Sequence, residues 1–213
     1  MVTGNTVIDA LLWARERRRE PGSLLLAELD KHAGPVLLVT THRRDSSGDA
    51  IREVGQAVAD ISRARPDLVV VLQVHPNPIV RQQLLPPLEV LANVKVVEPV
   101  SYGTFVHLMA LSTVILTDSG GIQGEAPSLG KPVLAMRETT ERPEAVRAGT
   151  VRLVGTDRST VGESVLCLLR DPDAYETMAK AVNPYGDRSA AARVTRSISR
   201  FLGQEAVAEE GSE

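Results

Sequence analysis

The chain has 213 residues, of which 43% are hydrophobic and 24% charged, so it has the composition of a globular protein and the length for one large domain or two small ones. Its net charge of −3 excludes the strongly basic surface by which proteins bind nucleic acids or anionic membranes. No apolar run approaches the roughly 20 residues that cross a bilayer, and a single cysteine excludes an internal disulfide.

The N-terminal segment argues against secretion. Its charged residues follow the short apolar stretch, which reverses the order found in a signal peptide. We therefore expect a cytoplasmic protein. The lone Cys167 falls at an apolar position of a predicted helix, which predicts that its side chain packs in the core.

Six short runs rich in β-branched residues predict strands, and most are apolar on both faces, as in a parallel sheet covered by helices on both sides. The runs are residues 35–40, 68–75, 94–99, 113–118, 132–137 and 150–155. Apolar residues recur every three or four positions between or after these runs, which predicts helices over 51–61, 105–109, 161–169 and 191–202. The alternation predicts an α/β fold with a single, Rossmann-like, doubly wound parallel sheet.

The chemically unusual residues collect just after the predicted strands. THRRD follows the first strand, HPNP the second, EPVSYGTF the third, DSGG the fourth and RETTERPE the fifth. In doubly wound sheets, ligands bind beyond the carboxyl ends of the strands. Five such corners, one after each of five successive strands, therefore predict a ligand site at this edge of the sheet.

The corner after the fourth strand contains Ser119, Gly120 and Gly121. Taken alone, it is typical of a tight strand-to-helix turn, for which glycine supplies a positive φ. The other interpretation is a phosphate site, where backbone N–H groups bind an anion, Ser119 adds a hydroxyl and Gly121 lets the ligand approach the backbone. One helical turn on, Glu125 either accepts two ribose hydroxyl protons or serves as a capping acid.

Basic residues follow the first two strands. His42, Arg43 and Arg44 either concentrate positive charge where a phosphate departs or form a solvated basic turn. His75 precedes the rigid Pro-Asn-Pro turn and is either a site residue or a hydrogen-bonded structural histidine.

Two further candidate site residues also have a purely structural interpretation. Phe105 either stacks on a base or packs in the core. Arg142, within TTERPE, either clamps a phosphate or pairs with Glu141 or Glu144.

Together these segments resemble, in order and spacing, the non-hydrolysing UDP-N-acetylglucosamine 2-epimerases. The resemblance covers residues 2–202 and is carried by VTGNTVIDAL, LVTTHRRD, VHPNPIV, ILTDSGGIQGEAPSLGKPVL, RETTERPEAVRAGT, LVGTD and NPYGD. It favours the phosphate site at the Ser-Gly-Gly corner. It also implies the C-terminal half of a glycosyltransferase-B fold, and an isomerase of polysaccharide biosynthesis that interconverts UDP-GlcNAc and UDP-ManNAc without an external cofactor or metal.

The resemblance assigns roles to individual residues. By motif, Ser119, Gly120 and Gly121 would bind the diphosphate, and Glu125 would bind the ribose. Phe105 would lie against the uracil, and Arg142 would bind near the phosphates or the sugar. His42 would assist UDP as it departs and returns. Some bacterial members bind a second, regulatory UDP-GlcNAc, and the resemblance would place His75 and an arginine of the Arg43-Arg44 pair there.

The sequence also departs from the family. The carboxylates that move the C2 proton lie on an N-terminal domain that this chain does not match. We therefore expect residues 1–20 to be an interdomain connection or the remnant of a helix, 21–203 a Rossmann-like UDP-binding domain and 204–213 a disordered acidic tail. Either the sequence is cut from a longer protein or a second polypeptide supplies the other half. Gly124 occupies a position where family members usually have an acidic residue. HRRDSSG replaces the family's usual HRREN, and Arg188 replaces the last glycine of its NPYGDG motif.

Three functions stay open at this stage. The first is an epimerase that is active only with an N-terminal half, and the second is a catalytically inactive module that binds UDP or UDP-GlcNAc. The third is half of a glycosyltransferase, and the TTERPE segment argues against it. The expected partners are the nucleotide sugar, a separate N-terminal epimerase domain or a second copy of the chain, and neither nucleic acid nor membrane.

Overall fold

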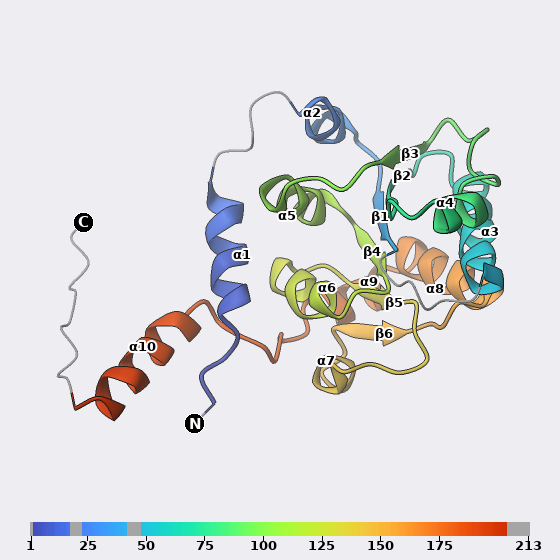
Figure 1. The fold of residues 1–213 in the computed structure, drawn as a ribbon. Coiled ribbons are helices and arrows are strands. Elements are labelled where there is room, and N and C mark those ends of the chain that lie inside the picture. Colours follow the sequence, from blue (N-terminus) through green and yellow to red (C-terminus); the bar gives the residue numbers. More distant parts are fainter. Residues whose placement is uncertain (1, 18–22, 42–47, 204–213) are drawn as a thin grey trace.

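The computed structural model describes residues 2–17, 23–41 and 48–203. Its centre is a six-stranded sheet in the order β3-β2-β1-β4-β5-β6, and every neighbouring pair of strands is parallel (Figure 1). The strands are β1 Val36–Thr40, β2 Val69–Gln73, β3 Val94–Val97, β4 Val114–Thr117, β5 Val133–Ala135 and β6 Val151–Leu153. The predicted doubly wound α/β fold and its six strands are confirmed.

Helices cover both faces of this sheet. On one face lie α3 (Gly48–Ala64), α4 (Pro78–Leu84), α8 (Arg158–Arg170) and α9 (Pro172–Ala179). On the other lie α1 (Thr6–Glu16), α2 (Leu24–Lys31), α5 (Tyr102–Leu111), α6 (Gly120–Glu125), the 3-10 helix η1 (Ala126–Leu129) and α7 (Pro143–Arg147). The last helix, α10 (Ala190–Phe201), lies outside these layers beside α1 (Figure 1).

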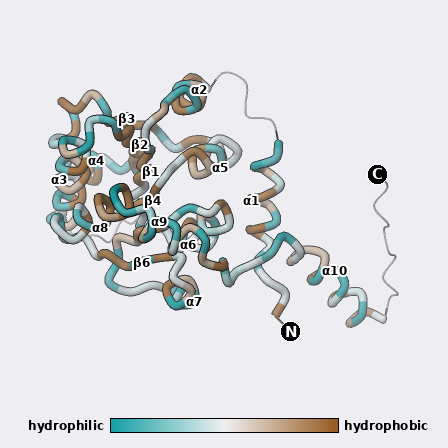
Figure 2. The backbone as a smooth tube through the Cα atoms, turned by 180° about the vertical axis from the view of Figure 1, so that it is seen from behind, coloured by the Kyte–Doolittle hydropathy of each residue, from teal (hydrophilic) through white to brown (hydrophobic). Residues whose placement is uncertain are grey.

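The alternation of side chains in β1 explains why the sheet is covered on both sides. Leu37 and Val39 join the hydrophobic cluster under α3 and α8, whereas Val36 and Leu38 join the cluster under α2 and α5. Figure 2 shows hydrophobic residues along the central strands of the sheet. A strand buried on both faces reads as a continuous apolar run, which is why the sequence pattern identified these strands.

The short helices α2, α4, α7 and α9 escaped prediction, because five to eight residues contain too little of the helical period, whereas the short helix expected after the Ser-Gly-Gly corner is α6. They do carry other signals. The side chains of Asn77 and Asp171 accept hydrogen bonds from backbone N–H groups at the starts of α4 and α9, and proline follows each cap. A capping residue followed by proline at the first helical position is a recognised helix start.

Two predictions about burial were wrong or incomplete. Cys167 is exposed on α8, because Val165 and Leu168 occupy the buried side of that helix. The helix at 191–202 forms, but its apolar stripe is not buried: Ile198 and Phe201 are exposed on α10, since that helix contacts α1 rather than the sheet.

The segment before α10 and the start of α10 contact α1, near the other end of the described chain. Asp9 of α1 accepts hydrogen bonds from the N–H groups of Ala190 and Ala191, at 3.3 and 2.6 Å. Arg188 forms an ion pair with Glu16 and has a φ of +73°, in the left-handed region that favours glycine. This is the position where the sequence replaces a family glycine.

The proposed domain boundary at residues 20 and 21 and the proposed disordered tail, 204–213, lie outside the described residues. Within the described part of the chain, no helix is both long and apolar enough to cross a membrane.

Candidate functional site

Buried polar side chains concentrate at the carboxyl ends of the strands. They belong to Thr40, Thr41, Gln73, Thr117, Asp118 and Arg137. The hydroxyls of Thr40 and Thr117 lie 2.6 Å apart and join β1 to β4. The chain order of the strands reverses between these two, which is the topological switch point where doubly wound proteins bind ligands.

Several buried polar atoms at this edge have no hydrogen-bond partner among the described residues. They are Oγ1 of Thr41, Oε1 of Gln73, Nε2 of Gln123 and Nε of both Arg137 and Arg142. A buried polar group without a partner costs about 1–3 kcal/mol, so it is rare in a native protein. All of those that the structure records belong to the last residue of β2 or to segments that follow β1, β4 or β5, which is the pattern expected of a polar ligand site.

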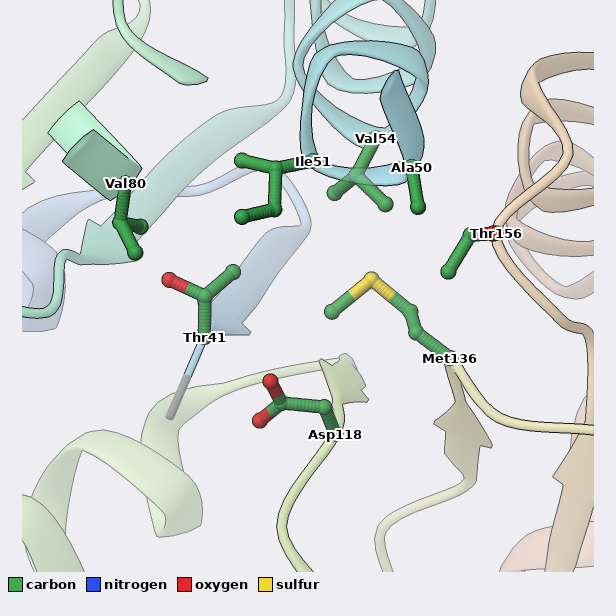
Figure 3. Close-up of a pocket in the computed structure, with 8 residues that line it drawn as sticks. All are labelled: Thr41, Ala50, Ile51, Val54, Val80, Asp118, Met136 and Thr156. Atoms are coloured by element: carbon green, nitrogen blue, oxygen red, sulfur yellow. The ribbon is translucent and has the colours of Figure 1, made fainter. Parts of the chain in front are cut away.

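A small hollow lies beside the switch point (Figure 3). Thr41, Asp118 and Met136 line it from the ends of three neighbouring strands, and Ile51 and Val54 close it from α3. Figure 3 shows the Thr41, Asp118 and Met136 side chains around one common space. Thr41 and Asp118 belong to two of the five predicted corners, and the ligand site itself stays a prediction.

The Ser-Gly-Gly corner begins α6 directly after β4. The Ser119 N–H donates to Oγ1 of Thr117 at 3.0 Å, whereas the Ser119 side chain makes no capping bond within the helix. Neither Gly120 nor Gly121 has a positive φ. The plain-turn interpretation required that conformation, so the reason for two glycines lies elsewhere.

The loop after β5 supplies that reason at Gly120. A Cβ placed on Gly120 would lie 1.9 Å from Oε1 of Glu141, whereas a Cβ on Gly121 would meet only ordinary contacts, at 3.6 Å from Oγ of Ser119 and 3.7 Å from Oε1 of Glu125. Glu141 is held by Nη1 of the buried Arg137 at 2.5 Å. Among the residues of the corner, Gly120 is therefore the one that a protein side chain approaches closely. The approach of a ligand to the backbone at Gly121 stays a prediction.

Glu125 ends α6 with its carboxyl half-buried. Its Oε2 accepts a hydrogen bond of 3.0 Å from the hydroxyl of Tyr102, the first residue of α5. Burial raises the pKa of Glu125, and the Tyr102 hydrogen bond opposes that shift. Burial and the neighbouring carboxylate raise the pKa of Tyr102, so its phenol keeps the proton that it donates.

A buried side-chain relay connects α6 to the loop after β5. Oε1 of Gln123 accepts from the Thr140 hydroxyl at 2.6 Å, and that hydroxyl accepts from the N–H of Arg142 at 3.0 Å. The Arg142 guanidinium carbon lies 5.2 Å from the centre of the Tyr185 ring. No ion pair of Arg142 with Glu141 or Glu144 occurs among the described residues, since Glu141 pairs with Arg137 and Glu144 accepts from the Tyr185 hydroxyl.

The remaining predicted residues lie farther along the edge. Nδ1 of His75 accepts from the Asn77 N–H at 3.0 Å, which fits the structural interpretation of this histidine. Phe105 is partly buried against the cluster under α5, as its core alternative predicted. His42, Arg43 and Arg44 lie outside the described residues.

Sequence reasoning missed Tyr102, Gln123, Arg137 and Thr140 as members of this site. Each of these residues lies in one of the segments that follow the predicted strands. The residue type alone does not show which side chain it contacts. Their roles depend on contacts between residues 4 to 23 positions apart in the chain. The described part of the chain contains no group of three or more His, Cys, Asp or Glu side chains that could hold a metal ion.

Comparison with known proteins gives the family. The family model described as UDP-N-acetylglucosamine 2-epimerase matches residues 1–199. The chain belongs to this family. A relative from Ralstonia solanacearum, named a probable UDP-N-acetylglucosamine 2-epimerase, is 50% identical over 209 residues, which cover 95% of this chain and 55% of the relative. The chain thus spans about half the length of the curated relatives that it matches.

Solved structures agree with this assignment. The crystal structure of UDP-GlcNAc 2-epimerase from Neisseria meningitidis bound to UDP-GlcNAc has a TM-score of 0.84 and 41% identity, and the match covers 94% of this chain and 55% of that one. The C-terminal domain of a group 1 glycosyltransferase from Francisella tularensis matches in fold alone, with a TM-score of 0.57 and 11% identity over 87% of this chain and 97% of that domain. The fold is that of the C-terminal half of a glycosyltransferase-B protein.

Proposed function

We propose that this chain is the nucleotide-binding half of an epimerase that interconverts UDP-GlcNAc and UDP-ManNAc. Membership of the family and the likeness to a structure bound to UDP-GlcNAc support the substrate class. The observation that carries the proposal is the edge of the sheet itself, where polar atoms of Thr41, Gln73, Gln123, Arg137 and Arg142 are buried without a partner among the described residues. Residues 21–203 would form the UDP-binding domain.

The corner and α6 would hold the nucleotide. Backbone N–H groups at Ser119, Gly120 and Gly121 would bind the diphosphate, and Glu125 would accept protons from the ribose hydroxyls. Support comes from the position of Glu125, whose Oε1 lies close to Gly121 and thus near the corner. The uracil would lie against the part of Phe105 that remains exposed.

Basic residues would act on the phosphates. Arg142 lies in the loop after β5, and its buried Nε has no partner among the described residues, so a donor is available for an oxyanion. His42 would assist the departing and returning UDP. His75, with Arg43 or Arg44, would contribute to a second nucleotide-sugar site, which a hollow lined by Thr41, Gln73 and His75 could accommodate.

The reaction would require groups beyond this chain. Removal of the C2 proton, elimination of UDP to leave 2-acetamidoglucal, and its re-addition after protonation on the opposite face need acids or bases on both sides of the sugar. No pair of acids in this half matches the family's proton-transfer carboxylates: Glu125 would hold the ribose, Glu141 pairs with Arg137, and Glu98 pairs with Arg81. We therefore propose that the chain alone is inactive and that an N-terminal epimerase domain supplies the proton-transfer carboxylates.

Two measurements test this proposal. Calorimetry should show that the chain binds UDP and that Glu125→Ala weakens binding by about 1–3 kcal/mol, because a charged acceptor of two hydroxyls is lost. Unchanged affinity would remove Glu125 from the site. Proton NMR of UDP-GlcNAc in deuterated buffer should show no deuterium at C2 with this chain alone; exchange that His42→Ala abolishes would refute the need for a second half.

A further inference from the structure

The hydrogen bond between Tyr102 and Glu125 connects two helices that follow distant strands. α5 follows β3 at one edge of the sheet, and α6 follows β4, with β2 and β1 in between. The Tyr102 hydroxyl nevertheless reaches Oε2 of Glu125, at 3.0 Å. No part of the proposed function uses this hydroxyl.

The two oxygens of Glu125 have different surroundings. Oε2 is bound by Tyr102, whereas Oε1 lies 3.7 Å from the position that a Cβ on Gly121 would take. An anchored Oε2 fixes the plane of the carboxylate, because rotation about the last side-chain bond would break the hydrogen bond. Oε1 is thereby kept on the side of the Ser-Gly-Gly corner.

Packing alone does not account for Tyr102. Its side chain is 47% exposed, so its ring contributes little to the core, unlike that of a buried residue. A neutral phenol that donates to a carboxylate makes a charge-assisted hydrogen bond, which is stronger than a neutral one. The hydroxyl is therefore the part of Tyr102 with a specific contact.

We propose that Tyr102 is a positioning residue, which orients Glu125 so that this carboxylate distinguishes a ribonucleotide from a 2′-deoxyribonucleotide. The inference rests on the proposed function, since it concerns the same nucleotide. A carboxylate held in one orientation can accept protons from both hydroxyls of a ribose, whereas a carboxylate free to rotate gains less from the second hydroxyl.

The test compares the affinities of UDP and 2′-deoxy-UDP by calorimetry. Wild-type chain should prefer UDP, and Tyr102→Phe, which removes one oxygen atom, should reduce this preference by about threefold to tenfold. Tyr175→Phe is the matched control, because Tyr175 is a partly buried tyrosine on α9, on the opposite face of the sheet. It should leave the preference unchanged.

A double-mutant cycle separates positioning from folding. In the Glu125→Ala background, Tyr102→Phe should no longer change the preference, whereas a general structural effect would persist. Thermal unfolding of each variant confirms that the fold is retained.

Three results would overturn the inference. The first is an unchanged preference in Tyr102→Phe, the second is an equal loss of affinity for both nucleotides, and the third is tighter binding of UDP, which would mean that Tyr102 blocks the site. If wild-type chain binds neither nucleotide, the proposed function fails and this inference fails with it, and that outcome is distinct from the other three.

Discussion

Glu141 lies directly over Gly120, with its Oε1 in the space that any β-carbon at that position would need. The buried guanidinium of Arg137 holds this carboxylate at 2.5 Å. A side chain on Gly120 would therefore push the Glu141 carboxylate aside and disturb its ion pair with Arg137, which Oε2 forms. The glycine is needed because two loops meet here, not because the turn requires a positive φ.

We expect Gly120→Ala to lower the free energy of unfolding by about 1 kcal/mol, since the exposed Glu141 carboxylate must move and its ion pair with Arg137 is weakened. Gly121→Ala is the control: its added methyl meets only ordinary contacts and alanine favours a helix, so stability should change by less than about 1 kcal/mol. Urea denaturation measures both. In a Glu141→Ala background the cost of Gly120→Ala should shrink, and equal costs in the two backgrounds would contradict this explanation.

The Thr140 hydroxyl should matter more than its methyl group. Thr140→Val keeps the shape but deprives Oε1 of Gln123 and the Arg142 N–H of a partner, which should cost about 1–3 kcal/mol of stability. Thr140→Ser keeps the hydroxyl and should retain most of that stability. If Arg142 acts on phosphate, Thr140→Val should also weaken binding of UDP more than that of uridine, which NMR titration can compare.

The left-handed backbone at Arg188 predicts an unusual order of stability between two variants. Both Arg188→Gly and Arg188→Ala remove the ion pair with Glu16, but only glycine adopts a φ of +73° without steric cost. Arg188→Gly should therefore be more stable than Arg188→Ala by about 1 kcal/mol. Thermal unfolding measures the difference, and a more stable alanine variant would mean that this segment changes conformation.

The ion pair between α3 and α8 gives a defined pH dependence. Nε of Arg158 donates to Asp60 at 2.6 Å and lowers the pKa of Asp60 below its ordinary value of 3.8. The folded state thus binds the proton more weakly than the unfolded state, so the stabilisation is complete above pH 3.8 and is lost as pH falls through the lower folded pKa.

We expect Asp60→Asn to cost roughly 0.5 kcal/mol at neutral pH, a small value because both side chains are nearly half exposed. The difference between wild type and variant should decrease toward zero below pH 3.8. Urea denaturation across this range checks the prediction, and Arg158→Gln should reproduce it. A difference independent of pH would show that charge is not the cause.

The sequence by itself determined the layers of the fold and the place of the site. Runs such as VLLVT and VILT, apolar at every position before the final threonine, can be satisfied only in strands covered on both faces, as β1 and β4 are. Because parallel strands bring their carboxyl ends to one edge, the corner at Ser119 and the loop with Arg142 had to lie near each other. These conclusions follow from local pattern and topology.

Only the tertiary structure decided which side chains meet at that edge. Tyr102 and Glu125 are 23 residues apart, and nothing in either segment specifies the other. The same holds for Gly120 beneath Glu141, and for Cys167 and Phe201, whose apolar character predicted burial that the neighbouring helices do not provide. Periodicity defines the face of a helix, but the partner of that face, and each contact between loops, depends on the packing of elements far apart in the chain.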